Sequence, residues 1–488
     1  MNLESYFASF RRLTIGYRLD YFTPYGKQQM LYADWIASGR LYRPIEYILT
    51  NEVGPFVGNT HTETSETGKL MTRAYHLAHE RIKMHVNAGP KDIILTTGTG
   101  MTGAVVKFQR ILGLKAGTRP SEGQYLDEKV RPVVFITHME HHSNQTSWYE
   151  TIADVVVIKP GKDLLFDLNH LEEALKSHQN GRPLIGSFTA CSNVTGIRTP
   201  IHEMAALMHR YGGRIFVDYA ASAPYDDIDM HPGNPIHDLD AVFFSPHKFL
   251  GGPGASGVLI FNSELYKNRV PDQPGGGTVD WTNAWGEYKF IEDIEVREDG
   301  GTPGFLQAMK AALSIELKQQ MGVENIHLRE DELLALAFRE LSKVPGMNIL
   351  ANNITTRLGV ISFYIDHIHY NLLVSILSDR FGVQMRGGCA CAGTYGHYLL
   401  DVSYETSQKI TNRITSGDLS SKPGWVRLSL HPTMLDQDVV YIAEALREIS
   451  LNHEEWSRDY QYNKHTNEFI HTKTIGSYKD VNDWLSLE

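Results

Sequence analysis

The chain has few cysteines, no long apolar run and no excess of positive charge. Its 488 residues include three cysteines, Cys191, Cys389 and Cys391. This small, odd number argues against a disulfide framework and indicates a reducing compartment, so we expect a cytoplasmic protein. No apolar stretch approaches the ~20 residues that span a bilayer. The first residues have neither a basic start nor an apolar core, so we expect no secretory signal.

The net charge is −11, and the sequence contains no basic stripe or arginine-rich tract. Binding to nucleic acid or to an anionic membrane needs clustered positive charge, so neither is an expected partner. The apolar and charged fractions, 42% and 21%, are those of an ordinary soluble globular protein. The length is sufficient for one large domain and a smaller one.

Predicted strands alternate with predicted helices between residues 61 and 325. After a long helix over 62–86, the pattern predicts strands at 92–97, 132–137, 155–158, 183–188, 214–218, 239–244 and 256–261. Such alternation predicts an α/β domain with a mainly parallel sheet and helices on both faces. Binding sites in these sheets lie at the carboxyl ends of the strands.

The remaining segments predict a smaller α+β domain, composed of residues 1–60 and 326–450. Its expected elements are strands at 357–365, 383–386 and 426–430 and helices at 370–381 and 435–449. Residues 451–488 are polar and aromatic, and this C-terminal extension has no role that the sequence assigns.

One lysine lies in a tight, glycine-rich turn between two predicted core strands. Lys248 belongs to residues 245–254, SPHKFLGGPG. Burying an unpaired ammonium is costly, but the position is tolerable if the amine is used covalently, for example as a Schiff base. The alternative is a surface lysine that neutralises a nearby carboxylate.

Asp218 ends the predicted strand before the lysine strand. Pyridoxal phosphate needs two protein groups of this kind, because a lysine attaches it covalently and a carboxylate keeps its pyridine nitrogen protonated. Taken alone, Asp218 is equally consistent with an ordinary acid at a strand end.

Residues 97–103, TGTGMTG, follow a predicted strand and begin a predicted helix. Free amides at a helix N-terminus bind phosphate. The run also matches Gly-x-Gly-x-x-Gly, so a nicotinamide dinucleotide-binding protein is an alternative. That fingerprint requires an acid ~20 residues further on, after the second strand. The acids here, Glu122 and Asp127, lie in a predicted loop before that strand.

Residues 217–220 (VDYA) and 245–248 (SPHK) together resemble the pyridoxal phosphate site of class V aminotransferases. The most similar group is the cysteine desulfurases and selenocysteine lyases, and the resemblance extends from about Tyr32 to about Ile449. It implies the fold type I of pyridoxal phosphate-dependent transferases. It also implies pyridoxal 5′-phosphate as the cofactor, with Lys248 as the attachment point and Asp218 at the ring nitrogen.

The resemblance also implies how the cofactor is held. Its phosphate would be bound by Thr99, the Gly100 amide, Ser245 and His247. Residues 300–303 (GGTP) resemble the segment by which a neighbouring subunit reaches the phosphate through Thr302. The glycines at 275–277 resemble a run near the dimer interface, so a homodimer with shared sites is expected.

Three further positions bear on the cofactor ring. In residues 139–144 (MEHHSN), the resemblance implies that one of His141 and His142 stacks on the ring, and we favour His142. Asn193 would bind the phenolic oxygen and the substrate. Ala221 departs from the family pattern, which often has glutamine there, so the phenolic oxygen would depend on Asn193 or Ser222.

Residues 386–393, RGGCACAG, carry two of the cysteines. A cysteine in a glycine-rich loop is accessible, and its thiolate is a nucleophile. Aligned on Arg386, Cys391 falls where desulfurases carry the cysteine that forms the persulfide. Cys389 replaces a common histidine, and in an extended loop the two cysteines would face the same side. A metal clip is the alternative, but no partners with metal-ligand spacing accompany the pair, so no metal is expected.

Arg427 lies in a strand-like run, VRLSL, and a guanidinium suits a carboxylate. The resemblance assigns it to the amino-acid substrate. The implied reaction removes sulfur or selenium from cysteine or its seleno-analogue, leaving alanine and a persulfide on Cys391. A sulfur-acceptor protein is then a further partner. A class V aminotransferase or epimerase is the alternative, and it would use Lys248, Asp218 and Arg427 but not Cys391.

Overall fold

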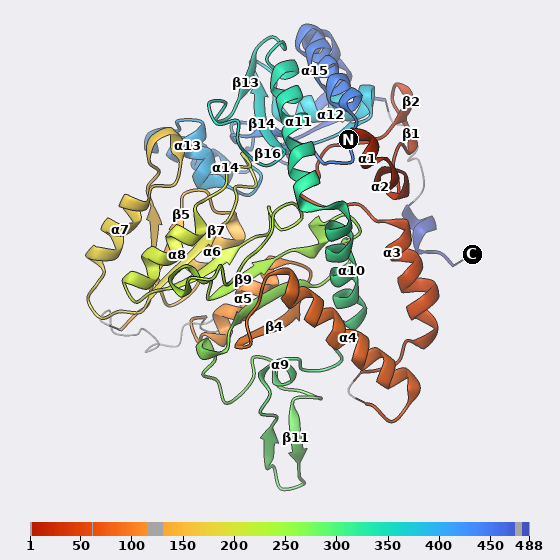
Figure 1. The fold of residues 1–488 in the computed structure, drawn as a ribbon. Coiled ribbons are helices and arrows are strands. Elements are labelled where there is room, and N and C mark those ends of the chain that lie inside the picture. The colour runs from red at the N-terminus through yellow and green to blue at the C-terminus, as the bar shows by residue number, and fades with distance from the viewer. Residues whose placement is uncertain (1, 61, 116–129, 474–480, 488) are drawn as a thin grey trace. The chain divides into compact units, whose positions relative to one another are not determined.

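The structure is a computed structural model that describes residues 2–60, 62–115, 130–473 and 481–487. It divides into two compact units (Figure 1). The larger comprises Ser38–Asn193 and Ile197–Glu324, and the smaller comprises Met1–Ala37, Val194–Gly196 and Asn325–Glu488. Residues 38–60, which the sequence analysis grouped with the smaller domain, therefore belong to the larger unit. Glu122 and Asp127 lie outside the described residues.

A seven-stranded sheet forms the centre of the larger unit, in the order β4-β10-β9-β8-β7-β5-β6. Its strands are β4 (Asp92–Thr97), β5 (Val133–Thr137), β6 (Asp154–Ile158), β7 (Leu184–Thr189), β8 (Arg214–Asp218), β9 (Ala241–Phe244) and β10 (Gly257–Asn262). β10 is antiparallel to both of its neighbours, and the other pairs are parallel. The predicted α/β architecture with a mainly parallel sheet is confirmed.

Helices cover both faces of this sheet. One buried cluster contains side chains of α4 (Glu66–His85), α7 (Leu168–Ser177), α8 (Ile201–Arg210) and α10 (Phe305–Met321). The other contains side chains of α5 (Met101–Ile111) and α6 (His142–Tyr149). Local signals set the helix limits: the Asp167 carboxylate caps α7 by accepting from the Asn169 amide at 2.8 Å, as its position before the helix predicted.

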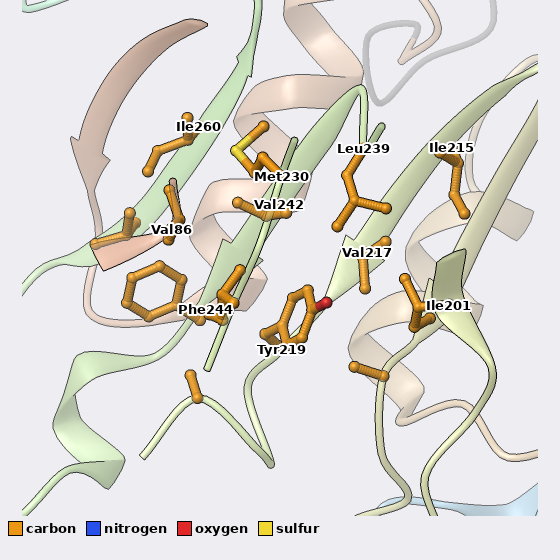
Figure 2. Close-up of a cluster of buried hydrophobic side chains, with 14 of the residues drawn as sticks. Val86, Ile201, Ile215, Val217, Tyr219, Met230, Leu239, Val242, Phe244 and Ile260 are labelled. Atoms are coloured by element: carbon orange, nitrogen blue, oxygen red, sulfur yellow. The ribbon is translucent and has the colours of Figure 1, made fainter. Parts of the chain in front are cut away.

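Alternation along the strands decides which face each side chain joins. On β8, Ile215 and Val217 belong to the cluster drawn in Figure 2, whereas Phe216 belongs to the opposite cluster. The same alternation places Asp218 on the face of Phe216, which α5 and α6 cover. The acid at the end of β8 and the N-termini of α5 and α6 therefore share one face of the sheet.

The smaller unit has a four-stranded antiparallel sheet in the order β13-β14-β17-β16. These strands are β13 (Met347–Ile349), β14 (Val360–Ile365), β17 (Trp425–Ser429) and β16 (Arg386–Gly388). The principal helices are α11 (Val323–Leu341), α12 (Tyr370–Phe381) and α15 (Asp436–Trp456). Near the N-terminus, β3 (Leu31–Tyr32) pairs in parallel with β15 (Val383–Gln384). The first residues add α1 (Leu3–Tyr6), α2 (Ala8–Leu13) and a hairpin of β1 (Asp20–Thr23) and β2 (Gly26–Gln29).

Two additions extend the smaller unit. Helices α13 (Gly393–Leu399) and α14 (Tyr404–Thr415) lie in the long segment between β16 and β17. After α15, the C-terminal extension forms a hairpin of β18 (Tyr460–Asn463) and β19 (Glu468–His471). No helix in the described ranges is both long and apolar enough to cross a lipid bilayer.

Candidate active site

Lys248 lies in the turn that joins β9 to β10, here called the lysine turn (residues 245–254). The side chain is partly buried, and the residue ends a short 3₁₀ segment, Pro246–Lys248. A Cβ on Gly252 would lie 1.8 Å from the Pro246 carbonyl oxygen, and a Cβ on Gly39 would lie equally close to the Phe249 carbonyl. Only glycine fits at these two positions, so backbone packing holds the lysine turn in one conformation.

Asp218 lies at the end of β8 and is 3% exposed. Its Oδ1 accepts a hydrogen bond from the Ala220 amide at 2.8 Å. Burial raises the pKa of Asp218 to about 6, although the nearby charge of Lys248 lowers it. An ionised carboxylate in this position is stabilised by any cation that reaches it, and a protonated pyridine nitrogen is such a cation.

Four predicted phosphate-binding residues meet at the N-terminus of α5. Thr99 and Gly100 immediately precede the helix, and the Ser245 hydroxyl accepts from the Met101 amide at 2.9 Å. His247 Nδ1 donates to the Thr99 carbonyl at 2.7 Å. The lysine turn is thus bonded to the helix N-terminus, where free amides, a hydroxyl and an imidazole form a cradle suited to an anion.

The two candidate histidines have different local roles. His141 is the N-cap of α6, and its Nδ1 accepts from the Ser143 amide at 3.1 Å. His142 is the first residue of the helix, and the two rings are 6.3 Å apart and inclined by 48°. The Ser143 hydroxyl lies 2.7 Å from the Thr102 hydroxyl on α5, so the two helix N-termini are connected. Stacking of His142 on the cofactor remains a prediction.

Glu140 is a buried acid that the sequence analysis did not single out. It is 1% exposed, and its carboxylate accepts from the Thr137 hydroxyl at 2.8 Å, the Thr189 amide at 2.9 Å and the Asn144 side chain at 2.8 Å. It therefore joins the ends of β5 and β7 to α6. The pKa of Glu140 is raised to about 8, mainly by burial and in small part by the charge of Asp218. The signal that could have revealed it was an acid three residues after a buried strand, Val133–Thr137.

The loops after β7 and β8 supply more polar groups. Asn193 is 7% exposed, and Ala221 is buried and contributes no polar atom. Ser222 is 1% exposed, and its hydroxyl has no hydrogen-bond partner within the described part of the chain. An orphaned buried hydroxyl four residues after Asp218 fits a bound polar ligand. Together with the lysine, the buried acid and the anion cradle, it shows that the residues present suit pyridoxal phosphate.

Two glycine segments that lie apart in the sequence come together in the larger unit. The Gly301 amide donates to the Gly276 carbonyl at 2.8 Å, and a Cβ on Gly300 would lie 2.2 Å from the Gln273 carbonyl oxygen. Thr302 follows on the surface, where its hydroxyl donates to the Asn59 side chain at 3.3 Å. The predicted contact of Thr302 with a neighbouring subunit remains a prediction.

In the smaller unit, residues 389–392 form a tight turn, here called the cysteine turn. The Ala392 amide donates to the Cys389 carbonyl at 3.1 Å, and the φ angles of Ala390 and Cys391 are 50° and 56°. Positive φ at both central residues is typical of a type I′ turn. The loop is therefore not extended, and the condition under which both cysteines would face one side is not met. Cys391 is exposed and Cys389 is partly buried.

Two arginines, the buried Arg427 and the exposed Arg386, share one carboxylate beside the cysteine turn. Arg427, on β17, is 3% exposed and donates from Nη2 to Asp34 Oδ1 at 2.8 Å, while Arg386 Nε donates to Asp34 Oδ2 at 3.1 Å. Burial lowers the pKa of Arg427, and the charges of Asp34 and Cys391 raise it. Cys391 is thus close enough to Arg427 to interact with it electrostatically. The sequence analysis did not predict a role for Asp34. The pattern that could have indicated one is a single acid at the end of a short apolar run.

Other chemistry has less support. Among the residues that the structure describes, no group of three or more His, Cys, Asp or Glu side chains is arranged to hold a metal ion. The lysine turn, rather than an acid after a second strand, is what lies against the glycine run of α5. The geometry therefore favours a phosphate cradle over a dinucleotide site.

Comparison with known proteins identifies the family of the chain. A family model described as Aminotransferase class-V matches residues 32–442. A probable cysteine desulfurase of Staphylococcus epidermidis is 29% identical over 375 residues, covering 75% of this chain and 84% of the relative. A probable cysteine desulfurase of Halalkalibacterium halodurans is 28% identical over 370 residues, which cover 74% of this chain and 84% of the relative.

Two solved structures share the fold. Cysteine desulfurase from Thermococcus onnurineus has a TM-score of 0.70 at 20% identity, with 87% of this chain and 95% of that chain covered. The cysteine desulfurase CsdA from Escherichia coli, in an S-sulfonic acid form, has a TM-score of 0.69 at 20% identity. The match covers 92% of this chain and 98% of that chain. The resemblance inferred from the motifs is confirmed, as is the fold type.

Proposed function

Since the chain belongs to the class V aminotransferase family, we propose that it is a pyridoxal 5′-phosphate-dependent cysteine desulfurase, with selenocysteine as a second substrate. The observation that carries the proposal is the exposed Cys391, held in a tight turn directly after β16, the strand that pairs with the strand of the buried Arg427. An aminotransferase or epimerase needs the arginine but not an exposed nucleophile beside it. The relatives described as probable cysteine desulfurases support the same choice.

The larger unit would hold the cofactor. Lys248 would carry it covalently and Asp218 would face its ring nitrogen, because this acid is buried and lies near the lysine charge. The remaining contacts would come from the phosphate cradle, the α6 N-terminus and the loop after β7, through Thr99, Gly100, Ser245, His247, His142 and Asn193. Bound there, the cofactor would withdraw electrons from the substrate Cα.

The chain's own residues would then act on the substrate. Arg427 binds the carboxylate of the amino acid, and Lys248 moves the proton at Cα. The Cys391 thiolate attacks the substrate sulfur, so that a sulfur–sulfur bond forms and the carbon–sulfur bond breaks. Free cysteine and the Cys391 thiol yield alanine and a Cys391 persulfide, and no external oxidant is needed. The persulfide sulfur passes to an acceptor, for which a sulfur-acceptor protein is one expected partner.

A homodimer is part of this proposal. The hairpin of β11 (Val279–Thr282) and β12 (Tyr288–Phe290) follows the 275–277 glycines and exposes Trp281, Trp285 and Tyr288 by 48%, 86% and 58%. Figure 1 shows it projecting from the larger unit. Exposed aromatic clusters are typical of interfaces, so a second copy is the expected cover. A protein that stays monomeric with full cofactor and activity at high dilution would contradict this. The three free cysteines suit a reducing cytoplasm.

The test is the substitution Cys391→Ser. It should abolish alanine formation from cysteine, while the visible absorbance of the bound cofactor stays unchanged. Cys191→Ala is the matched control, because Cys191 is buried and has no part in the proposed chemistry. If Cys391→Ser releases alanine at the wild-type rate, the desulfurase proposal fails and an aminotransferase or epimerase takes its place.

A further inference from the structure

The two cysteines of the cysteine turn have different neighbours. The charge of Cys391 acts on Arg427. Burial raises the pKa of Tyr370, the first residue of α12, and the charge of Cys389 adds to this shift. The strand that leads to Cys389 packs against the same helix, because a Cβ on Gly387 would lie 3.2 Å from the Tyr370 ring. One cysteine therefore lies toward the proposed substrate arginine, and the other toward α12.

Tyr370 is also a wall of a cavity of about 330 Å³. Residues 364–370, Leu400, Pro423 and Gly424 line this cavity. A Cβ on Gly424 would lie 2.7 Å from the Tyr370 ring and 3.0 Å from the Cα of Gly388, so these groups are in contact. Gly424, a lining residue, therefore packs against the residue that precedes Cys389. Its volume is at the lower end of small-molecule sites.

The insertion between β16 and β17 lines part of the cavity, and the C-terminal extension supports one of its walls. Leu400 and Pro423 flank the inserted helices α13 and α14. The Tyr370 hydroxyl donates to the Lys422 carbonyl at 3.1 Å and accepts from Asn467, in the C-terminal hairpin, at 2.6 Å. The hairpin also bonds the insertion directly, from the Leu419 amide to the Lys464 carbonyl at 2.8 Å. The C-terminal extension thus holds a wall of the cavity in place.

We propose that Cys389 is a second sulfur carrier, which takes sulfur from Cys391 and delivers it to a low-molecular-mass thiol bound in this cavity. The proposal rests on the proposed desulfurase function and extends it to the acceptor. A small thiol is the occupant because the cavity has the size of a small-molecule site and is lined mainly by aromatic, histidine and aliphatic side chains.

The transfer balances without any oxidant or reductant. The Cys389 thiolate attacks the outer sulfur of the Cys391 persulfide, a new sulfur–sulfur bond forms, and Cys391 leaves as a thiolate. The acceptor thiolate then attacks the same sulfur on Cys389 and leaves with it as a small persulfide. Two links of 3.8 Å join the Cα atoms of the cysteines, and a turn shortens their separation below the ~7.6 Å of a straight chain.

The first experiment follows the sulfur. The holoenzyme is given limiting cysteine and then glutathione, and alanine, glutathione persulfide and the alkylated peptide of the cysteine turn are measured by mass spectrometry. In the wild type, before glutathione is added, fragment ions should place one extra sulfur on Cys389. In Cys389→Ser, the extra sulfur should remain on Cys391, and the yield of glutathione persulfide per alanine should fall about tenfold. In Cys391→Ser, Cys389 should acquire no sulfur.

Two results would overturn the relay. One is an unchanged yield of glutathione persulfide per alanine in Cys389→Ser. The other is a Cys389–Cys391 disulfide with free sulfide, because that product means attack on the inner sulfur. A failure of the desulfurase proposal itself would look different. In that case the wild type would form no alanine from cysteine, and both the desulfurase function and the relay would be refuted.

The second experiment tests the cavity. Leu400→Trp should fill part of it and slow the transfer to glutathione about tenfold, with a smaller loss for the compact thiol 2-mercaptoethanol. Leu399→Trp is the matched control, because Leu399 lies on α13 beside Leu400 but does not line the cavity. Equal rates in Leu400→Trp and Leu399→Trp with both thiols would overturn the assignment of the cavity.

Discussion

The lysine turn and the cysteine turn are both short connections that present a reactive side chain, but they are built in different ways. In the lysine turn, Cβ atoms on Gly252 or Gly39 would collide with backbone carbonyls. Gly388, which precedes the cysteine turn, has a φ angle of 118°, but a Cβ there would meet nothing within 4 Å, and Cys391 is exposed. The first turn is locked by backbone packing, and the second is open to its surroundings.

The difference follows from what each side chain is proposed to do. A lysine that holds a cofactor and moves one proton needs a fixed position relative to Asp218. A cysteine that takes sulfur from a substrate and passes it on must meet several partners, so exposure serves it better. Substitutions in the two turns should accordingly differ in kind, with loss of the cofactor site in one and loss of sulfur transfer in the other.

The largest effect is expected for Lys248→Ala. Because the cofactor loses its covalent attachment and the reaction loses its base, no turnover should be measurable. Borohydride reduction followed by mass spectrometry should find the cofactor on the Lys248 peptide of the wild type and on no peptide of the variant. Lys267→Ala, an exposed lysine of the same unit, is the control. Fixation of the cofactor on another lysine would refute the assignment.

A smaller effect is expected for Asp218→Asn. The amide can still accept the Ala220 hydrogen bond, but it cannot pair with a protonated ring nitrogen. We expect kcat to fall about a hundredfold, as is common when one preorganised electrostatic partner is removed. The visible spectrum and steady-state kinetics measure the two effects separately. Normal turnover in this variant would mean that the ring nitrogen is not held by Asp218.

On the side of the cysteine turn, Asp34→Ala should act mainly through substrate binding. Asp34 orients both Arg427 and Arg386, so its loss leaves a buried guanidinium without its carboxylate. The KM for cysteine should rise about tenfold, with a smaller change in kcat. Asp20→Ala, which removes an exposed partner of Lys27, is the control. An unchanged KM in a folded variant would show that Arg427 does not depend on Asp34.

The smallest effect concerns the pH dependence of stability in the cofactor-free protein. Burial raises the pKa of Asp218 from 3.8 to about 6, so the folded state binds its proton more tightly than the unfolded state. The carboxyl therefore contributes full stability below pH 3.8, and this contribution is lost as the pH rises to about 6. The loss is about 3 kcal/mol at 1.36 kcal/mol per pH unit.

The measurement is the melting temperature of wild type and Asp218→Asn between pH 4 and pH 7. The variant should melt a few degrees higher at pH 7, and the difference should disappear near pH 4. Adding the cofactor to the wild type should reduce the difference in melting temperature at pH 7, because the ionised Asp218 then pairs with the protonated ring nitrogen. A difference that does not change with pH would show that Asp218 is not destabilised by its own ionisation.

Sequence patterns alone determined the large sheet and several of the proposed site residues. Alternating apolar runs predicted β4 through β10 closely, because strand and helix periods are local properties of the chain. The caps were equally local, as Asp167 before α7 shows. The motifs around Asp218 and Lys248 were sufficient to identify the family, since each combines a strand end with a chemically specific side chain.

Only the tertiary structure decided the contacts between distant segments. Asp34 and Arg427 are 393 positions apart, and no local pattern reveals that one orients the other. Glu140 needed the packing of β5, β7 and α6 before its burial was visible, and the C-terminal hairpin needed Tyr370 before its support of a cavity was visible. The physical reason is that periodicity and turn chemistry act over a few residues, whereas burial and ion pairing depend on which distant segments meet.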